Sequence, residues 1–293
     1  MTRATLISDL WEPIQKYIGA LNTRSMPAVH HYTSVKGALG ILDSGQMWFT
    51  ERAHLNDPSE ISHGIDLAKS ILCAKGRSYD ATRLDDSTKR VFHDFRFFSA
   101  SFSFEHDDLS QWRNYSDDGK GVVLSFKASA FNNPHIYISK IIPDNPTVIV
   151  CPMSYDPERL KQLIESIIKK WTGGDIEKLC DHLFMISSLF KGDCWKSENE
   201  YRFFVHQKRD QILKRECFKV RERNSNIVTY LEIPIQNWES TTDFPIYRIC
   251  LGPAAPCGLD AELSDFIFAK GISISQDNIV RSTIPYRSVR QIF

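Results

Sequence analysis

One compact unit near the start of the chain restricts the possible folds more than any other part of the sequence. A short apolar segment at residues 28–32 runs into a threonine-serine pair, whose hydroxyls can cap a helix over residues 35–43. Gly45 is placed to end that helix, and residues 46–50 are typical of a strand. The predicted unit is therefore a strand, a capped helix, a turn and a second strand.

Two features of the next stretch predict a long helix followed by a loop. Asp57 can cap a helix, a proline follows it, and Glu60 stands three residues after it, a combination typical of a helix N-terminus. We therefore expect a helix from this point to about Ala74. The polar stretch over residues 75–86 is typical of a loop.

The remaining chain alternates between helical and strand patterns. Over residues 97–104 aromatic residues alternate with serine, which predicts a half-buried strand with Phe98, Phe102 and Phe104 facing inward. The other expected elements are helices over residues 107–115, 157–171, 175–191 and 259–269, and strands over residues 122–126, 201–205, 227–233 and 246–251.

The expected domain organisation is simple. No internal repeat, low-complexity tract or linker divides the chain, so we expect residues 28–293 to form a single domain. Within residues 1–27, apolar side chains recur at helical spacing between Leu6 and Ile18 and predict an amphipathic helix that packs on that domain.

Charge and cysteine content exclude several classes of protein. The 36 basic residues equal the 36 acidic residues, so no overall field draws the chain to nucleic acid or to an anionic membrane. The seven cysteines include no C-x-x-C pair, which argues against a disulfide framework or a zinc site and favours a reducing cytoplasm. No stretch is apolar enough to span a membrane, and we expect no bound metal.

Two segments carry hydroxyl and imidazole groups that a binding site can use. His31-Tyr32-Thr33 ends the first expected strand, where a strand-to-helix junction exposes side chains at the edge of a cleft. Ser101 and Ser103 share one face of their strand and can donate hydrogen bonds to a ligand. The alternatives are a hydrogen-bonded core histidine, a threonine that only caps the helix, and serines on a solvated strand face.

A third segment combines two carboxylates with an arginine. Glu198 and Glu200 project to the same side of an extended chain, and Arg202 follows on that side. Two carboxylates held close together repel, so one of them has a raised pKa or pairs with a cation. The alternative is a salt-bridged strand edge exposed to solvent.

A fourth segment is rich in aromatic and polar side chains. Trp112 and Tyr115 can stack on a planar ring and Arg113 can hold a phosphate, or the two rings can pack a helix onto the core. The chain contains no P-loop, Rossmann, zincin or hydrolase motif, so those enzyme classes lack their usual markers.

An ordered set of residues spans most of the chain: His31-Tyr32-Thr33-Ser34, Gly45, Trp48, Thr50, Asn56-Asp57-Pro58, Glu60, Ser101-Phe102-Ser103, Gln111-Trp112-Arg113, Tyr115, Gly121, Glu198, Glu200-Tyr201-Arg202, Ser282 and Pro285-Tyr286-Arg287. This set resembles the prokaryotic family catalogued as domain of unknown function 2971, over about residues 29–287. The opening histidine strand is also similar, more distantly, to the DNA-targeting ADP-ribosyltransferases and RNA phosphotransferases of the ADP-ribosyltransferase fold.

The resemblance implies an ADP-ribosyltransferase-like α+β fold, with a split mixed or antiparallel sheet as its core and with inserted and flanking helices. It also implies NAD as the substrate. In that superfamily the histidine hydrogen-bonds the ribose or the nicotinamide amide, the serine strand supports the pocket, and a late glutamate contacts the nicotinamide ribose. Carried over, these residues are His31, Ser101 with Ser103, and Glu200. Glu198 takes the first position of an E-x-E pair, which positions the acceptor in some members.

The chemistry that the resemblance implies has a physical basis. Breaking the glycosidic bond of NAD builds positive charge on the ribose, and a carboxylate near its hydroxyls stabilises that charge. Tyr32 or Trp48 is expected to stack on the nicotinamide, Arg113 to hold the pyrophosphate, and Thr33 to complete the NAD-binding set. The sequence departs from the superfamily at Phe102, because phenylalanine cannot donate the hydrogen bond of the usual threonine.

The expected function is transfer of one ADP-ribose unit from NAD to a protein or nucleic-acid acceptor, in the setting of a toxin or a phage-defence effector. One alternative is a non-catalytic module of the same fold that binds a nucleotide, a nucleic acid or a protein. A second alternative is an RNA phosphotransferase or nuclease-like enzyme with Arg113, Arg202 and Arg287 as phosphate ligands.

Overall fold

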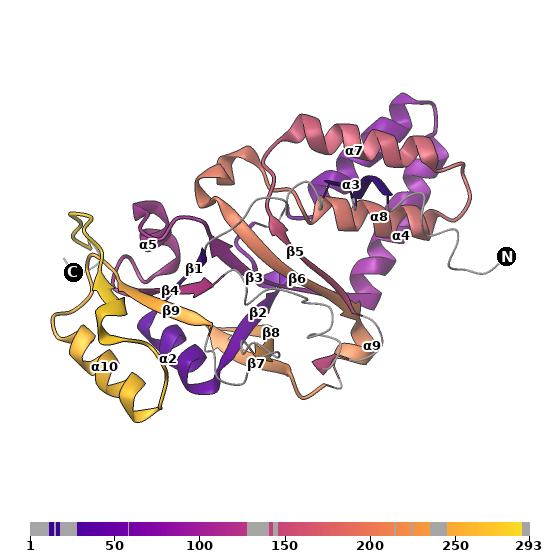
Figure 1. Ribbon diagram of the computed structural model, residues 1–293. Coiled ribbons are helices and arrows are strands. Elements are labelled where there is room, and N and C mark those ends of the chain that lie inside the picture. Colours follow the sequence, from indigo (N-terminus) through magenta and orange to yellow (C-terminus); the bar gives the residue numbers. More distant parts are fainter. Residues whose placement is uncertain are drawn as a thin grey trace.

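A computed structural model shows a protein of the α+β class, with an open mixed sheet and a separate group of helices (Figure 1). The predicted class is therefore confirmed. The structure describes residues 12–14, 16–17, 28–57, 59–127, 141–142, 146–213, 215–223, 225–234 and 245–288. Among these residues, no helix is long and apolar enough to cross a membrane.

The sheet has the strand order β10-β9-β4-β1-β3-β2-β8-β7, and β6 pairs with both β3 and β5. Among the described pairs, β9 and β10 run parallel and the others antiparallel. The strands are β1 (Ala28–Thr33), β2 (Gln46–Glu51), β3 (Phe95–Ser103), β4 (Val122–Lys127), β5 (Thr147–Pro152), β6 (Glu200–Lys208), β7 (Phe218–Arg223), β8 (Asn226–Pro234), β9 (Ile246–Leu251) and β10 (Ile279–Arg281).

The sheet divides at β3. One edge of β3 pairs with β6 along its whole length. On the other edge β1 pairs only at Ser103, and β2 pairs only at Phe98 and Ser99. Ser101 lies between these two contacts and is exposed. The two halves of the sheet therefore diverge from β3 at Ser101, and we call this place the strand gap.

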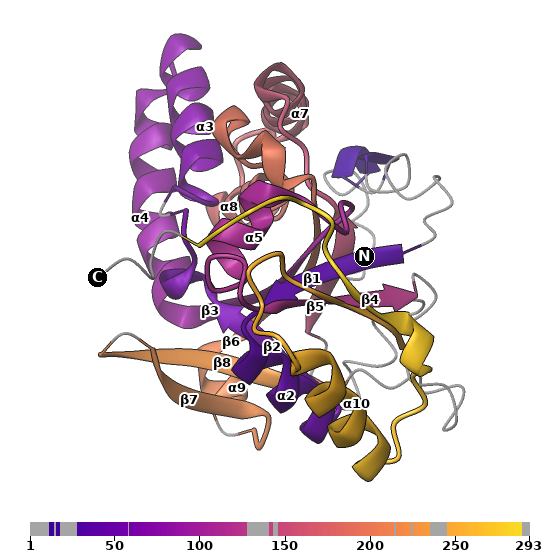
Figure 2. The same cartoon turned by 90° about the vertical axis from the view of Figure 1, so that its left-hand side faces the viewer.

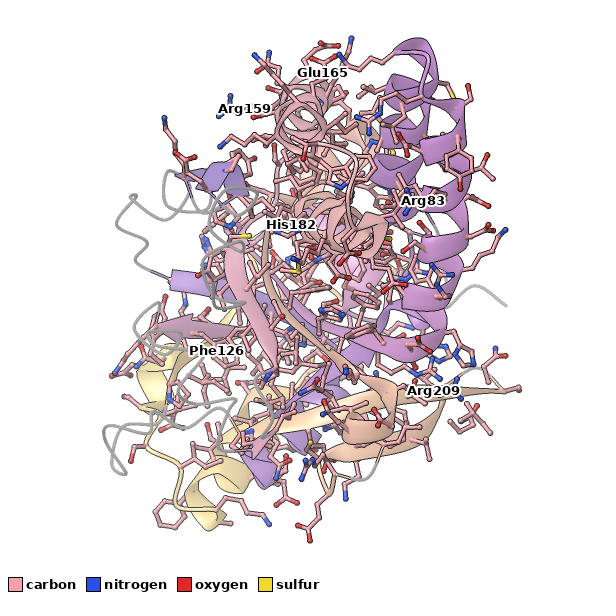
Figure 3. The ribbon with its side chains drawn as sticks, turned by 90° about the vertical axis from the view of Figure 1, so that its right-hand side faces the viewer. Arg83, Phe126, Arg159, Glu165, His182 and Arg209 are labelled. Carbon is pink, nitrogen blue, oxygen red and sulfur yellow. The ribbon has the colours of Figure 1, made fainter. Side chains whose placement is uncertain are left out.

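One face of β3, β5 and β6 is covered by a helical layer (Figure 1). Its apolar core joins the helices to Phe97, Ile149 and Phe204 of the sheet. Figure 3 shows His182 inside this layer and Phe126 in the sheet beneath it. The helices that pack together here are α3 (Ser62–Ala74), α4 (Ser78–Asp94), α7 (Pro157–Lys170) and α8 (Ile176–Ser187).

A second apolar core lies on the opposite face of the sheet. It contains the predicted inward-facing residues Phe98 and Phe102, while Phe104 packs against it partly buried. Two helices contribute to it, α2 (Val35–Ser44) and α10 (Leu259–Ala269). Alternate side chains of β3 therefore pack into the two different cores, because successive side chains point to opposite faces of a strand.

The opening unit folds as its sequence predicts. Ser34 caps α2 by accepting a hydrogen bond from the Gly37 amide at 3.1 Å. Gly45 ends the helix with φ +62°, in the left-handed region that favours glycine. β1, α2 and β2 agree with the predicted ranges to within one residue.

The loop predicted for residues 75–86 is wrong, because α4 begins at Ser78. Ala81, Leu84 and Val91 form a narrow buried stripe on this helix. The other faces are charged and carry ion pairs one turn apart, such as Lys89–Asp85 at 2.8 Å. Most residues of α4 are polar, so the sequence pattern did not reveal its buried stripe. The strands β5 and β7 were not predicted either.

The helix start predicted at Asp57 is also wrong, because α3 begins at Ser62. Asp57 accepts a hydrogen bond from the Ser59 amide at 2.9 Å and so closes a local turn. Ile61 then has φ +70°, a strained value for a β-branched residue, and its side chain is buried in the helical layer. This bend allows Glu60 to point away from the helix.

The helix predicted over residues 6–18 falls mostly outside the described residues. Residues 12–14 and 16–17 are described and are helical. Ile14 and Tyr17 are buried in the core of the helical layer, and the Tyr17 ring stacks on Phe190 with centroids 5.3 Å apart.

Candidate functional site

Five charged side chains are buried together at the junction of the helical layer and the sheet. Each is at most 7% exposed, and ion pairs join them; we call them the carboxylate cluster. They come from the turn before α3, from the chain after α8, from the 3-10 helix η3 (Asp193–Glu198) and from the start of β6. Its members are Glu60, Lys191, Glu198, Glu200 and Arg202.

Arg202 is the centre of this cluster. Its Nε donates to Glu200 Oε1 at 2.7 Å, and its two terminal nitrogens donate to the two Glu60 oxygens at 2.8 Å each. Paired hydrogen bonds of this kind hold both partners in one plane and are among the strongest in proteins. Arg202 therefore fixes the positions of Glu60 and Glu200.

Lys191 connects the remaining carboxylate to the cluster. Its Nζ lies 2.5 Å from Glu198 Oε2, 3.5 Å from Glu200 Oε2 and 3.8 Å from Glu60 Oε1. No sequence motif singled out Lys191. A second cation could have been expected only on general grounds, because buried carboxylates need positive partners and Arg202 alone cannot neutralise three of them.

Glu200 is held in its ionised form. Burial by itself raises the pKa of Glu200, but the charges of Arg202 and Lys191 outweigh burial and lower the pKa to about 2. The Ser101 side chain also hydrogen-bonds the Glu200 carboxylate. Glu200 is therefore suited to stabilise a positive charge and unsuited to donate a proton near neutral pH.

Glu198 and Glu200 converge by a route that the sequence did not predict. Glu198 ends η3, and Asn199 then takes the left-handed conformation with φ +43°. The Asn199 amide donates to Glu105 Oε1 at 3.0 Å. The two carboxylates meet at Lys191 because of this turn, and the predicted extended chain is wrong.

Tyr115 and Asn56 complete the surroundings of Glu198. The Tyr115 hydroxyl donates to Glu198 Oε1 and accepts from the Asn56 amide. Burial and the neighbouring Glu198 raise the pKa of Tyr115, so the phenol stays protonated. Tyr115 reaches this position at the end of α5 (Leu109–Tyr115), a helix capped by Asp108.

His31 lies at the strand gap. Its Nδ1 donates to the Ser101 carbonyl at 2.9 Å, in the place where a neighbouring strand would otherwise pair with β3. Burial lowers the pKa of His31 to about 4, although the bond to Ser101 acts in the opposite direction, so the ring is neutral at pH 7. Through Ser101, His31 and Glu200 belong to one connected group.

His30 and His31 lie on opposite faces of β1, as predicted. His30 is directly opposite Ser103 of β3 and Ser125 of β4, and its Nδ1 is 2.9 Å from Ser125 Oγ. Burial, His106 and Arg248 lower the pKa of His30 to about 4.

Three further residues of the predicted site form hydrogen bonds with other parts of the protein: Ser103, Tyr32 and Thr33. The Ser103 hydroxyl donates to the Glu198 carbonyl at 2.9 Å, and the Tyr32 hydroxyl donates to the Glu105 carbonyl at 2.8 Å. Tyr32 packs its ring edge-on against Trp112 with centroids 5.0 Å apart. The Thr33 carbonyl accepts from Ser116. Here these residues hold the loops that position Glu198 and α5.

The last two residues of the predicted site have different neighbours from those described above: Arg113 and Trp48. Arg113 is 56% exposed at its side chain, and its Nε is 4.0 Å from Asp118 Oδ1. Asp118 also accepts from the Tyr286 hydroxyl at 2.7 Å, so Arg113 lies beside the C-terminal segment. Trp48 lies on β2 against Tyr230 of β8, with ring centroids 5.4 Å apart.

The structure thus brings His31, Ser101, Glu198 and Glu200 together, and it adds partners that the sequence interpretation had not assigned. No curated protein and no solved structure matches the chain. A family match covers residues 111–203, which carry Tyr115, Lys191 and both glutamates. This segment matches a family described as a protein of unknown function (DUF2971), which supports that part of the resemblance over a shorter range.

Proposed function

We propose that this protein transfers ADP-ribose from NAD to a protein or nucleic-acid acceptor. One observation carries the proposal: at the strand gap the exposed residue Ser101 accepts a hydrogen bond from a neutral imidazole at its backbone carbonyl, and its hydroxyl bonds a carboxylate that is held ionised. An anion fixed beside an accessible polar group is the arrangement that favours a reaction in which a ligand becomes cationic.

The proposed reaction breaks the bond between ribose C1′ and the nicotinamide nitrogen. The bonding electron pair leaves with nicotinamide, which becomes neutral, and the positive charge passes to the ribose. Glu200 stabilises this charge, and Ser101 orients a ribose hydroxyl toward the carboxylate. The acceptor then forms the new bond at C1′ and loses its proton to Glu198 or to water.

The surroundings of Glu200 also favour a second candidate function. Both Glu200 oxygens already accept hydrogen bonds from Arg202, and Lys191 lies 3.5 Å away. A carboxylate paired to this extent is typical of a structural ion-pair network as well as of an active site. The second candidate is a non-catalytic module that binds a nucleotide, a nucleic acid or a protein at the strand gap.

Nicotinamide release from NAD tests the first candidate. We expect the wild-type protein to release nicotinamide and Glu200→Gln to release it about 100-fold more slowly or worse, because one aligned electrostatic group is lost. Ser101→Ala removes only the exposed hydroxyl and should also slow release while leaving the ion pairs intact. Glu177→Gln is the matched control, because Glu177 is an exposed residue of α8.

Thermal unfolding of each variant separates loss of chemistry from loss of fold. Equal release rates in wild type and Glu200→Gln would contradict the transferase. NAD binding by calorimetry without any release would favour the non-catalytic module instead.

A further inference from the structure

A second group of polar and aromatic side chains lies on the three strands β2, β8 and β7. The guanidinium carbon of Arg221 is 4.6 Å from the Trp48 ring centroid and 5.1 Å from that of Tyr230. We call Arg221, Trp48 and Tyr230 the arginine stack. Figure 2 shows these strands at the end of the sheet, below the helical layer. None of the proposed catalytic steps uses Arg221.

Strand register puts the arginine stack on the same face as Ser101. Tyr230 is opposite Thr50, and Thr50 is opposite Ser99 of β3. Residues directly opposite one another, and residues two apart on one strand, share a face of the sheet. Trp48, two residues before Thr50, and Ser101, two residues after Ser99, therefore face the same side.

The same register includes Arg221. It is opposite Val228, two residues before Tyr230 on β8. Neighbouring strands lie about 4.8 Å apart, so three spacings put β7 roughly 14 Å from β3. The row of Arg221 is also four residues from the row of Ser101 along the strands, roughly 13 Å, so the two backbones are roughly 19 Å apart. The contact with Trp48 directs the Arg221 side chain back toward the row of Ser101. An extended arginine side chain and the ribose diphosphate of a nucleotide can together span that distance.

The arginine stack also borders the strand gap. A Cβ placed on Gly40 would lie 3.1 Å from the Trp48 ring, so this ring contacts α2, the helix that joins β1 to β2. The positive charge of Arg221 contributes to the lowered pKa of His31, which agrees with their closeness. Together with the strand register, these observations place the stack near His31 and on the face of Ser101.

Some buried polar atoms on this face lack hydrogen-bond partners among the described residues. Trp48 Nε1 and Ser99 Oγ are examples. Most buried polar groups in proteins are paired, and each exception needs an explanation. A ligand with several acceptor oxygens would supply the missing partners when side chains around the gap adjust.

We infer that the arginine stack binds the diphosphate of a nucleotide whose ribose lies at Ser101. The inference rests on the proposed function for the identity of that nucleotide, which is NAD or its ADP-ribose part. Stacking on two rings orients the guanidinium plane, and an oriented guanidinium binds phosphate oxygens in pairs. Arg221 thereby takes the role that the sequence interpretation assigned to Arg113.

Arg113 is less suited to this role. Its Nε is 4.0 Å from the Asp118 carboxylate, which repels phosphate and competes for the guanidinium. Asp118 is only 4% exposed and is also bonded by Tyr286 and Ser288. A phosphate at Arg113 would have to approach that buried anion.

Calorimetry with ADP-ribose tests the inference, because ADP-ribose carries the diphosphate and needs no turnover. We expect Arg221→Gln to weaken binding roughly 10- to 100-fold, as for the loss of charged hydrogen bonds. Arg221→Lys should fall between, because it keeps the charge and loses the planar fork. Arg83→Gln, on α4, is the matched control and should bind as the wild type does.

Two further measurements separate phosphate binding from a structural role. Nicotinamide riboside, which lacks the diphosphate, should bind wild type and Arg221→Gln equally. ADP-ribose should change the tryptophan fluorescence of the wild type, and Trp48→Phe should remove that change. Melting temperatures show whether each variant is folded.

The outcomes distinguish this inference from the proposed function. Unchanged ADP-ribose affinity in folded Arg221→Gln overturns the inference, even if NAD is turned over. Loss of oligonucleotide binding in that variant, with ADP-ribose binding unchanged, overturns it in favour of a nucleic-acid surface. No binding of ADP-ribose by the wild type overturns it as well. Arg221-dependent binding of ADP-ribose without nicotinamide release supports it while contradicting the transferase.

Discussion

Glu200 shows how a charged carboxylate can be stable in the interior of a protein. Removing a carboxylate from water is costly unless cations and hydrogen-bond donors replace the solvent. Arg202, Lys191 and Ser101 do so here, and the pKa of Glu200 falls to about 2 as a result. The same contacts that stabilise the anion in the folded state determine how the protein responds to acid.

The stability of the protein should therefore depend on the ionisation of Glu200. The pKa of Glu200 is about 2 in the folded state against an ordinary value of 4.5, so the group stabilises the fold above about pH 4.5. This contribution, about 3 kcal/mol, is lost as the pH falls from 4.5 to 2. The difference in unfolding free energy between wild type and Glu200→Gln should shrink over that range.

Urea unfolding at a series of pH values measures this difference. Glu177→Gln controls for the loss of one carboxylate at the surface. A constant difference between wild type and Glu200→Gln from pH 6 to the acid limit would mean that Glu200 is not ionised in the way its contacts indicate.

At the scale of single elements, three left-handed or strained residues direct the chain. Gly45 ends α2, Ile61 turns Glu60 away from α3, and Asn199 brings Glu198 and Glu200 to one cation. Glycine was recognisable in the sequence because it favours this conformation. An isoleucine with positive φ could not be expected, since local sterics disfavour it and only the buried contacts of its side chain compensate.

Substitution of Gly45 tests how much a left-handed residue at a helix end contributes to stability. Gly45→Ala should lower the free energy of unfolding by about 1 kcal/mol, because an alanine at φ +62° is strained. Its Cβ would meet nothing within 4 Å, so the loss reflects backbone conformation alone. Chemical denaturation measures the change.

Gly174→Ala is the matched control for Gly45→Ala. A Cβ there also meets nothing within 4 Å, and φ lies outside the positive range. Its unfolding free energy should stay within about 0.5 kcal/mol of the wild type. Equal losses at both positions would show that the helix cap is not the cause.

At the scale of the whole molecule, the carboxylate cluster joins the helical layer to the sheet. Arg202 belongs to β6, and Glu60 lies just before α3. This pair therefore links two parts of the fold whose apolar cores lie on opposite faces of the sheet. Its loss should affect the stability of both parts together.

Arg202→Met should destabilise the protein by about 3–5 kcal/mol, because it removes the guanidinium that pairs with Glu60 and Glu200 and leaves both carboxylates buried. Urea denaturation followed by tryptophan fluorescence and by circular dichroism measures the loss. Arg209→Met is the control, since Arg209 is exposed at the start of the short helix α9 (Arg209–Ile212) and is labelled in Figure 3. A loss below 1 kcal/mol in Arg202→Met would contradict the structural role of the cluster.

Most of the regular elements could be predicted from the amino-acid pattern, and the α+β class followed from the family resemblance. Caps, glycine stops and alternating apolar residues act within a few residues, so Ser34, Gly45 and the period of two along β3 were readable directly. The resemblance also indicated that His31, Ser101 and Glu200 belong together.

Which side chains meet depends on how distant segments pack in the folded chain. Lys191, Tyr115 and Asn56 join the glutamates across long stretches of chain, and no local pattern encodes such contacts. Glu60 illustrates the physical reason. Its local sequence predicts a helix-capping residue, but in the folded protein it pairs with the buried guanidinium of Arg202. Leaving that cation without a second carboxylate would cost more free energy than the loss of a helix cap.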